Sequence, residues 1–249
     1  MKCEILYIAS SEEHQEMAKF SIESLRKVSN LPIAFATSQP DKITRNKIDD
    51  FRVIKIEKNP HDIPRAAGKL YQSSAVWRSK ILALRDCFLK TPKKTLIFVD
   101  ADTKFLADPS EIVSDFYDIA ACRENCYYQD EDVFGRCVNF YINTGFLILN
   151  KNEKTINLIN EAFSIYENLE KNLTTNELFN PKRPNENLTC NDQRAFNIAL
   201  SKDYSLKTFI LSNEWNVRQP LLKIVENPKM YHLPDLHKKN NPWEPFLVK

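Results

Sequence analysis

Short apolar runs alternate with longer amphipathic stretches through the first half of the chain. The runs at Glu4–Ala9, Ile33–Thr37 and Val53–Ile56 are bounded by polar or turn-forming residues, which is typical of strands. Between the first two runs, apolar residues recur at helical spacing. Ser10, with Glu13 three positions later, predicts a capping box at the start of this helix. The pattern therefore predicts a strand, a helix and two further strands.

The clearest hydrophobic pattern lies in residues 72–99. The stretch Gln72–Leu89 predicts a long amphipathic helix, and it leads into the continuous apolar run Thr95–Val99. A continuous run of this kind is typical of a strand that is covered on both faces in a parallel sheet. Because strands and helices alternate, the sequence predicts an α/β fold with a mainly parallel sheet flanked by helices.

The second half continues the alternation. The predicted elements are a short helix from Pro109, strands at Ile119–Cys122, Phe140–Leu149, Leu206–Leu211 and Lys229–His232, and helices at Glu153–Leu169 and from Asp192. Residues 171–191 hold too few apolar side chains for a core element, so we expect a mobile surface loop there.

Composition narrows the class of protein. The 249 residues are 43% hydrophobic, which is enough for a packed core, and we expect one domain over 1–249. The chain has 35 basic and 33 acidic residues, and the formal charge of +2 gives no electrostatic case for nucleic acid as a partner. Neither a signal peptide nor an apolar stretch of membrane-spanning length is recognisable, so we expect a cytoplasmic protein without a transmembrane segment.

Two aspartates, one residue apart, follow the apolar run Thr95–Val99. If that run is a strand of a parallel sheet, Asp100 and Asp102 lie at its C-terminal end, where ligands bind in open α/β sheets. Their carboxylates suit a hard divalent cation that keeps coordination positions for diphosphate oxygens. The alternative is that both residues form a turn or cap the helix at Pro109.

The Asp-x-Asp spacing is a weak signal by itself. Asp130 and Asp132 repeat it in a polar stretch that follows no predicted strand, and we interpret them as part of a solvated loop. A strand followed by Asp100, Asp102 and Thr103 also matches the first motif of haloacid dehalogenase-type phosphatases, in which Asp100 would be the nucleophile. Against a phosphatase, about a hundred residues precede the motif, and no later strand ends in paired acids.

Four segments occur in an order that is found in one enzyme family: FVDADTKFLADP, YINTGFLILNK, NDQRAFNIAL and YHLPDLHKKNNPW. With them the chain resembles the metal-dependent GT-A glycosyltransferases, nearest the retaining branch that includes glycogenin-like enzymes and bacterial galactosyl- and glucosyltransferases. The resemblance spans about Ile5 to Trp243. It implies a single Rossmann-like GT-A domain with a nucleotide-binding half, 1–102, and a sugar and acceptor half, 103–249.

The resemblance implies a metal site that holds Mn²⁺ or Mg²⁺. Asp102 and Asp100 would bind the cation, Asp100 would also reach the ribose, and His232 would be the third ligand. The family usually reads His-x-x-Gly-x-x-Lys-Pro-Trp, but here no glycine follows His232 and Pro242 comes two residues late. His237 is therefore a rival ligand.

The resemblance also implies donor and catalytic residues. Asn143 would touch the donor sugar, and Asp192 and Gln193 would lie beside the sugar and the acceptor. Asn143 could instead be a turn residue, and Asp192 the first-turn acid of a helix. Lys80 lies where the family carries a basic residue near the donor phosphates, although an isolated lysine usually faces solvent. The other implied contacts to the donor are Ala9, Ala101, Thr144, Gly145 and Lys238, with Lys239 as an alternative to Lys238.

The expected activity is metal-dependent transfer of a sugar from a nucleotide diphosphate, with retention, to a hydroxyl of a glycan, a lipid-linked molecule or a protein. A UDP-sugar is the expected donor, although no motif residue distinguishes uridine from guanosine. Asp192 could act as a nucleophile, or Gln193 could support attack from the leaving-group face. The alternatives are the phosphatase and a catalytically inactive nucleotide-sugar-binding protein. A nucleotidyltransferase would need a glycine-rich loop after the first strand, which is lacking.

Overall fold

The computed structural model describes residues 2–9, 11–37, 51–55, 74–124, 141–172 and 192–247. The strands are β1 (Cys3–Ala9), β2 (Ile33–Thr37), β3 (Phe51–Lys55), β4 (Thr95–Val99), β5 (Thr103–Phe105), β6 (Ile119–Arg123), β7 (Ile142–Asn150), β8 (Thr208–Leu211) and β9 (Met230–His232). The α-helices are α1 (Glu12–Leu25), α2 (Ser74–Lys90), α4 (Glu153–Asn172) and α6 (Asp192–Lys202). Short 3-10 helices cover Pro109–Ile112, Asn213–Asn216, Gln219–Leu221 and Glu244–Phe246.

Seven of these strands form one sheet in the order β3-β2-β1-β4-β7-β6-β8. β1, β2, β3 and β4 are parallel to their neighbours in this part of the sheet, and β6 is parallel to β8. β7 runs antiparallel to both β4 and β6. The predicted mainly parallel sheet is confirmed, and the reversal of β7 brings its first residues beside the last residues of β4.

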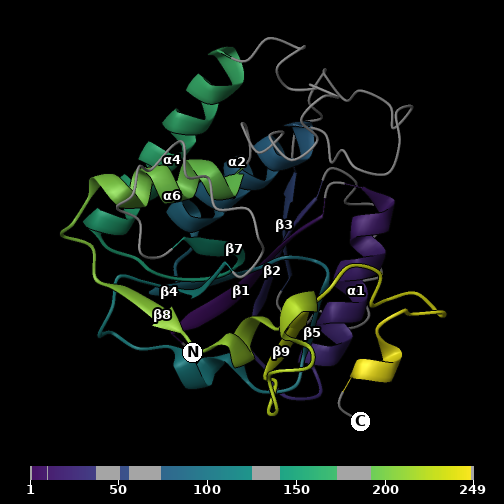
Figure 1. The fold of residues 1–249 in the computed structure, drawn as a ribbon. Coiled ribbons are helices and arrows are strands. Elements are labelled where there is room, and N and C mark those ends of the chain that lie inside the picture. The colour runs from purple at the N-terminus through teal and green to yellow at the C-terminus, as the bar shows by residue number, and fades with distance from the viewer. Residues whose placement is uncertain are drawn as a thin grey trace.

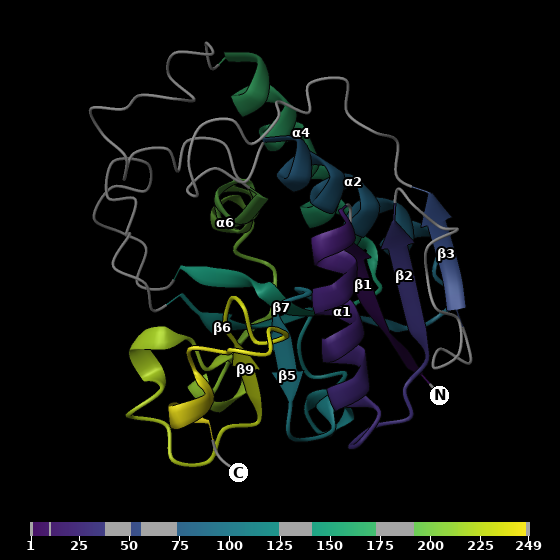
Figure 2. The ribbon, with the colours of Figure 1, turned by 90° about the vertical axis from the view of Figure 1, so that its right-hand side faces the viewer.

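The two faces of the sheet are buried in two separate apolar clusters, because successive side chains of a strand point to opposite faces. In β4, Leu96 and Phe98 pack with the helical layer of α2, α4 and α6, whereas Ile97 and Val99 pack with α1. Figures 1 and 2 show these helices on opposite sides of the sheet, with β5 and β9 on the side of α1. Burying each such side chain contributes roughly 1.5–3 kcal/mol to stability.

Helix α1 begins one residue later than the capping box predicted. Ser11 is the N-cap, with extended backbone, and its Oγ accepts a hydrogen bond from the backbone N–H of His14. Glu12 and Glu13 occupy the first turn, where the helix dipole favours negative charge. The prediction of Ser10 as the cap was therefore wrong.

Two further predictions differ from the structure or lie outside it. β5 was not predicted, because three residues are too few to show an alternating pattern; it pairs with β9 in a separate two-stranded sheet. The loop expected over 171–191 lies outside the described residues from 173 onward, and α4 continues through Asn172.

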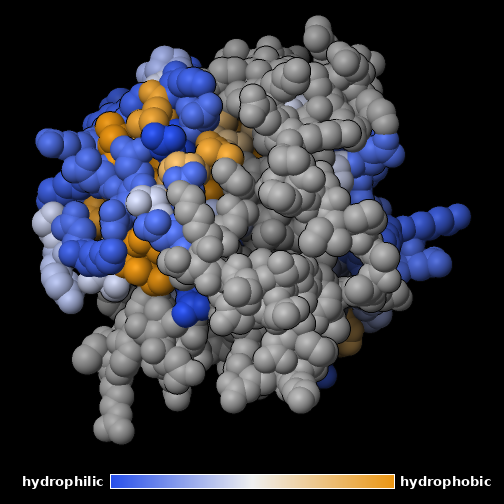
Figure 3. Space-filling view, turned by 90° about the horizontal axis from the view of Figure 1, so that it is seen from above, coloured by the Kyte–Doolittle hydropathy of each residue, from blue (hydrophilic) through white to orange (hydrophobic). Residues whose placement is uncertain are grey.

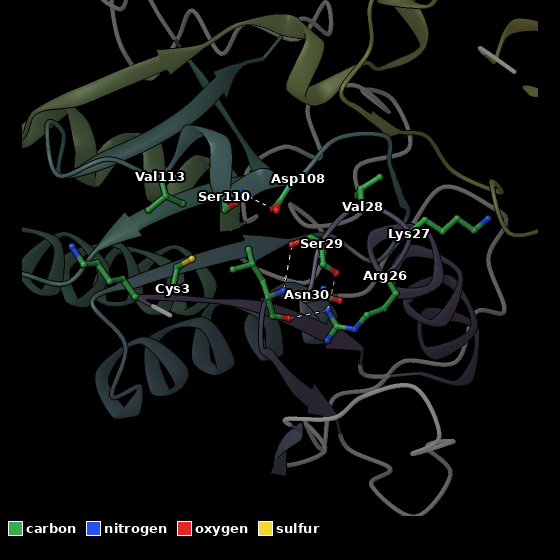
Figure 4. Close-up of a pocket in the computed structure, with 11 residues that line it drawn as sticks. Cys3, Arg26, Lys27, Val28, Ser29, Asn30, Asp108, Ser110 and Val113 are labelled. Atoms are coloured by element: carbon green, nitrogen blue, oxygen red, sulfur yellow. Dashed lines mark hydrogen bonds between the residues drawn. The ribbon is translucent and has the colours of Figure 1, made fainter.

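A cavity of about 570 Å³ lies at the far end of the strands from Asp100. Its walls come from the start of β1, the turn after α1 and the segment around Asp108 (Figure 4). Arg26 donates hydrogen bonds there to the carbonyl groups of Ser29 and Leu31, so its guanidinium supports the turn. This cavity does not contact the predicted site residues.

Seen from above, the described part of one face carries mostly hydrophilic side chains with smaller apolar areas between them (Figure 3). None of the helices in the described ranges combines the length and the hydropathy that are needed to cross a bilayer.

Candidate metal and donor site

The backbone around Asp100 and Asp102 is held from several directions. The N–H of Asp100 donates to the carbonyl of Gly145 at 2.8 Å, and the N–H of Leu233 donates to the carbonyl of Asp102 at 3.0 Å. The first bond comes from β7 and the second from the residue after β9. The two aspartates are therefore fixed where β4, β7 and β9 meet.

A buried chain of hydroxyl groups also supports Asp100. Thr103 Oγ1 donates to the Asp100 carbonyl at 3.0 Å, and it lies 2.6 Å from Ser21 Oγ, which is 3.0 Å from the Tyr7 hydroxyl. Because Thr103 uses its proton on the carbonyl, Ser21 must donate to Thr103 and Tyr7 to Ser21. The chain joins α1 and β1 to the turn that carries the aspartates.

Asp100, Asp102 and His232 each place one ligand atom within 4.8 Å of the others. His232 Nε2 lies 3.3 Å from Asp102 Oδ1 and 3.6 Å from Asp100 Oδ2. The pairing of β5 with β9 sets this geometry, since Thr103 is opposite His232. His237 is described but does not belong to this group, so of the two predicted histidines the structure places His232 beside the aspartates.

The three side chains fit a divalent cation of the Mn²⁺ or Mg²⁺ type. Two carboxylates and one imidazole are a common donor set for such ions. Burial raises the pKa of Asp102, but the charge and the hydrogen bond of the adjacent His232 outweigh burial and bring this pKa down to about 2, so the carboxylate is ionised at neutral pH. Gly145 leaves room for the cluster, because a Cβ there would lie 2.2 Å from His232 Cε1 and 2.8 Å from Asp100 Oδ2.

Asn216 orients the His232 ring, and no sequence pattern pointed to it. The residue is 1% exposed, and its Oδ1 lies 2.9 Å from His232 Nδ1. When a cation is bound by the aspartates, the lone pair of His232 Nε2 would face that cation, and the proton on Nδ1 would be donated to Asn216 Oδ1. Asn216 belongs to no motif, and only its position after Trp215 in a 3-10 helix brings it to the histidine.

Lys80 lies inside the site. Its Nζ is 2.9 Å from Asp100 Oδ1 and 2.8 Å from Asp192 Oδ2, and its side chain is 15% exposed. Burial alone would lower the pKa of Lys80, but the charges of Asp100 and Asp192 raise it above its ordinary value. The Phe98 ring lies under the ammonium group at 5.1 Å. The solvent-facing alternative for Lys80 is therefore wrong.

The predicted catalytic and sugar-contacting residues also come together. Asp192 is the first residue of α6, and its Oδ2 accepts from Thr144 Oγ1 at 3.0 Å as well as from Lys80. Gln193 Oε1 accepts from the N–H of Thr144 and from Asn143 Nδ2, each at 3.1 Å. Asn143 is buried and lies inside β7, so it is not a turn residue.

The remaining predicted contacts divide into two groups. Ala9 ends β1 at the same edge of the sheet as Asp100, and Ala101 lies between the two aspartates; both are buried. Lys238 instead pairs with Asp235 at 2.6 Å on the turn after β9. Lys239 is exposed. Ala9 and Ala101 therefore lie at the edge of the sheet that carries the metal cluster. Lys238 forms its ion pair outside this cluster.

Asp235 explains how the chain departs from the His-x-x-Gly pattern. It occupies the position of the glycine and has φ of 65°, in the left-handed region. Aspartate is one of the few residues with a side chain that enters this region at modest cost. The Trp243 indole then donates to the carbonyl of Pro234 at 2.6 Å and closes the turn.

No protein-family model matches the sequence, and no significant match was found among curated proteins. Among solved structures, the chain is similar to a crystal structure of the galactosyltransferase LgtC in complex with donor and acceptor sugar analogs, with a TM-score of 0.64 and 12% sequence identity. The alignment covers 98% of this chain and 93% of that chain. With its Asp-Asp-His cluster at the end of β4, this chain has the fold of the GT-A glycosyltransferases.

Proposed function

We propose that the protein is a retaining glycosyltransferase that depends on Mn²⁺ or Mg²⁺. It takes a sugar from a nucleotide diphosphate donor, with a UDP-sugar as the first candidate, and transfers it to a hydroxyl of a glycan, a lipid-linked molecule or a protein. One observation carries the proposal: Asp100, Asp102 and His232 form a cation site that is joined through Lys80 to Asp192. The resemblance in fold to a galactosyltransferase supports it.

The chemistry follows from where charge develops. Departure of the sugar leaves negative charge on the diphosphate, and a divalent cation held by Asp100, Asp102 and His232 would stabilise that charge. Lys80 supplies a second, fixed positive charge between Asp100 and Asp192. Because the pKa of Lys80 is raised, its ammonium group stays protonated at neutral pH. The site therefore favours a multiply charged anionic leaving group, such as a nucleoside diphosphate, over a neutral one.

Asp192 and Gln193 are the residues that we assign to the sugar. The Oδ2 atom of Asp192 is bound by Lys80 and Thr144, whereas its Oδ1 has no hydrogen-bond partner among the described residues. Oδ1 could attack the anomeric carbon, displace the nucleotide diphosphate and then be displaced by the acceptor hydroxyl. Alternatively, the acceptor attacks from the leaving-group face and Gln193 supports it by hydrogen bonding. Both routes give retention.

The proposal predicts that UDP binds only in the presence of the divalent cation, because Asp100 and Asp102 otherwise repel the diphosphate. Calorimetric titration of UDP into the protein, with Mn²⁺ and then with excess EDTA, measures this. Asp102→Asn is the matched variant, and it should bind UDP weakly in both conditions. Binding that is unchanged by EDTA would show that the cluster does not hold a cation for the nucleotide.

A thermal-shift series with UDP-, GDP- and ADP-sugars then identifies the base and the sugar. The same preparation should not hydrolyse para-nitrophenyl phosphate above background. Phosphatase activity that is lost in Asp100→Asn would favour the haloacid dehalogenase alternative. Nucleotide-sugar binding without any transfer or hydrolysis would favour the inactive binding protein.

A further inference from the structure

A buried carboxylate outside the predicted motifs holds the residues of the sugar side in place. Glu124 directly follows β6, and its side chain is 6% exposed. Its Oε2 accepts from Asn143 Nδ2 at 2.7 Å and from Gln193 Nε2 at 3.0 Å. An Arg218 terminal nitrogen donates to both of its oxygens, at 2.6 and 2.8 Å. Glu124 therefore joins the end of β6 to β7, to α6 and to the segment before β9.

The two ends of the Gln193 amide have partners of opposite chemistry. Its Oε1 accepts from the backbone N–H of Thr144, which can only donate, and from Asn143 Nδ2. Its Nε2 donates to the Glu124 carboxylate, which can only accept when ionised. A rotated amide would place its NH₂ against the Thr144 N–H and its oxygen against the carboxylate. These contacts therefore fix the orientation of the amide.

This orientation decides what Gln193 can offer a ligand. Its oxygen already accepts two hydrogen bonds. Its nitrogen has one proton directed to Glu124 and a second proton without a partner among the described residues. Gln193 is also partly exposed, next to Asp192. We propose that Glu124 is a positioning residue that makes Gln193 present an N–H, and not its carbonyl oxygen, to the substrate. The proposal rests on the proposed function for the identity of that substrate.

Arg218 neutralises the charge of the buried Glu124 carboxylate, and its neighbours in the chain contact His232. An unpaired buried carboxylate would be strongly destabilising, and Arg218 neutralises its charge. The neighbouring Val217 accepts from the N–H of His232 at 3.0 Å and donates to the carbonyl of Met230 at 2.9 Å. The segment from Asn216 to Arg218 therefore contacts both His232 and Glu124, so one backbone segment positions the two sides of the site.

The first test uses Glu124→Gln, which keeps the size of the side chain but has one acceptor oxygen for three donors. The side-chain NH₂ signals of Gln193, assigned by their absence in Gln193→Met, should include one proton, the one directed to Glu124, that exchanges slowly with water in the wild type and fast in the variant. Glu161→Gln, which removes the charge from the exposed pair with Lys202, is the matched control and should leave these signals unchanged. Unchanged protection in Glu124→Gln would overturn the proposal. If that variant does not fold, Glu124→Asp, which keeps the charge for Arg218 but shortens the side chain by one methylene and so withdraws the acceptor from Gln193, provides the same measurement.

The second test exchanges the two side chains in the double variant Glu124→Gln, Gln193→Glu. The pair can then form a hydrogen bond in the opposite direction, and the carboxylate now at position 193 can still accept from the Thr144 N–H, but its side chain has no N–H to offer. The proposal predicts that the double variant binds UDP with Mn²⁺ as tightly as the wild type does. Its turnover of UDP-galactose or UDP-glucose should be roughly 100-fold below that of the wild type. If turnover is restored, the Gln193 N–H has no role and the proposal is wrong.

Failure of the proposed function would show in different measurements from failure of this proposal. Wild-type protein that binds none of the UDP-, GDP- and ADP-sugars in the presence of Mn²⁺ would contradict the glycosyltransferase assignment. The exchange protection of the Gln193 amide would still decide whether Glu124 orients it, because that measurement needs no substrate.

Discussion

The ammonium group of Lys80 joins two carboxylates that lie far apart in the sequence. Asp100 belongs to the metal cluster and Asp192 to the side assigned to the sugar. Both aspartates were predicted as site residues from their motifs, but the contact between them through Lys80 was not predictable. A lone lysine on an amphipathic helix carries no signal for its partners, since only the packing of α2 against the sheet decides where its end lies.

The roles of the two sides can be separated at Asp192. Asp192→Asn keeps the shape and can still accept from Thr144, but it removes the charge next to Lys80. We expect transfer to fall by at least ~100-fold while UDP affinity changes little, the pattern for an interaction made chiefly in the transition state. Turnover assays with calorimetry on the same preparation measure both quantities.

Asp102→Asn is the comparison, and it should lose UDP affinity and transfer together. Normal turnover in Asp192→Asn would make Asp192 a structural residue at the start of α6. A loss of UDP affinity as large as in Asp102→Asn would place its role at the diphosphate instead of the sugar.

Asn216 offers a test of the metal site that needs no substrate. Asn216→Leu removes the acceptor that fixes the His232 ring, and we expect Mn²⁺ affinity to fall roughly 10- to 100-fold. The unbound Mn²⁺ signal in electron paramagnetic resonance titrations measures the affinity directly. Asn216→Asp keeps an acceptor at the same place and should remain within a few-fold of the wild type. Equal affinities in all three proteins would show that the ring needs no such partner.

Among the elements, β7 has one property that the sequence predicted, its strand structure, and one that it did not predict, its direction in the sheet. Its apolar run predicted a strand, and the polar Asn143 and Thr144 within that run predicted a site. The direction of the strand was not predictable: a continuous apolar run shows that both faces of a strand are buried, and it is typical of parallel sheets, but β7 is antiparallel to both of its neighbours. The reversal places the start of β7, and so Gly145, beside the end of β4. Because Gly145 has no Cβ, it leaves the space that His232 and Asp100 occupy, and the motif alone did not show this requirement.

The turn after β9 gives a prediction about stability. Asp235 has the left-handed backbone that glycine adopts freely. Asp235→Ala should lower the free energy of unfolding by about 1 kcal/mol, whereas Asp235→Gly should stay within about 0.5 kcal/mol of the wild type. Both variants lose the pair with Lys238, so the difference between them reports the backbone alone. Urea denaturation measures it, and equal losses in the two variants would contradict a conformational cause.

For the whole molecule, the order of strands and helices was largely predictable because long amphipathic and apolar runs are strong local signals. The fold class and the Asp100, Asp102 and His232 cluster followed from these runs and from the motifs. Glu124, Asn216 and Arg218 were not predictable. Each is a polar residue outside any motif, and its importance comes from partners that only the tertiary structure brings near. Local pattern thus predicts the elements better than the contacts between them.

The pairing of β5 with β9 also bears on how the protein is made. Thr103 and His232 are neighbours in this small sheet although most of the second half of the chain separates them. Closing so long a loop costs entropy that is recovered only when the strands pair. On the ribosome, the two aspartates emerge well before the histidine. The nascent chain can thus build β1, β2 and β4 while the cluster of Asp100, Asp102 and His232 is still incomplete, and the cluster can form only after His232 has been synthesised.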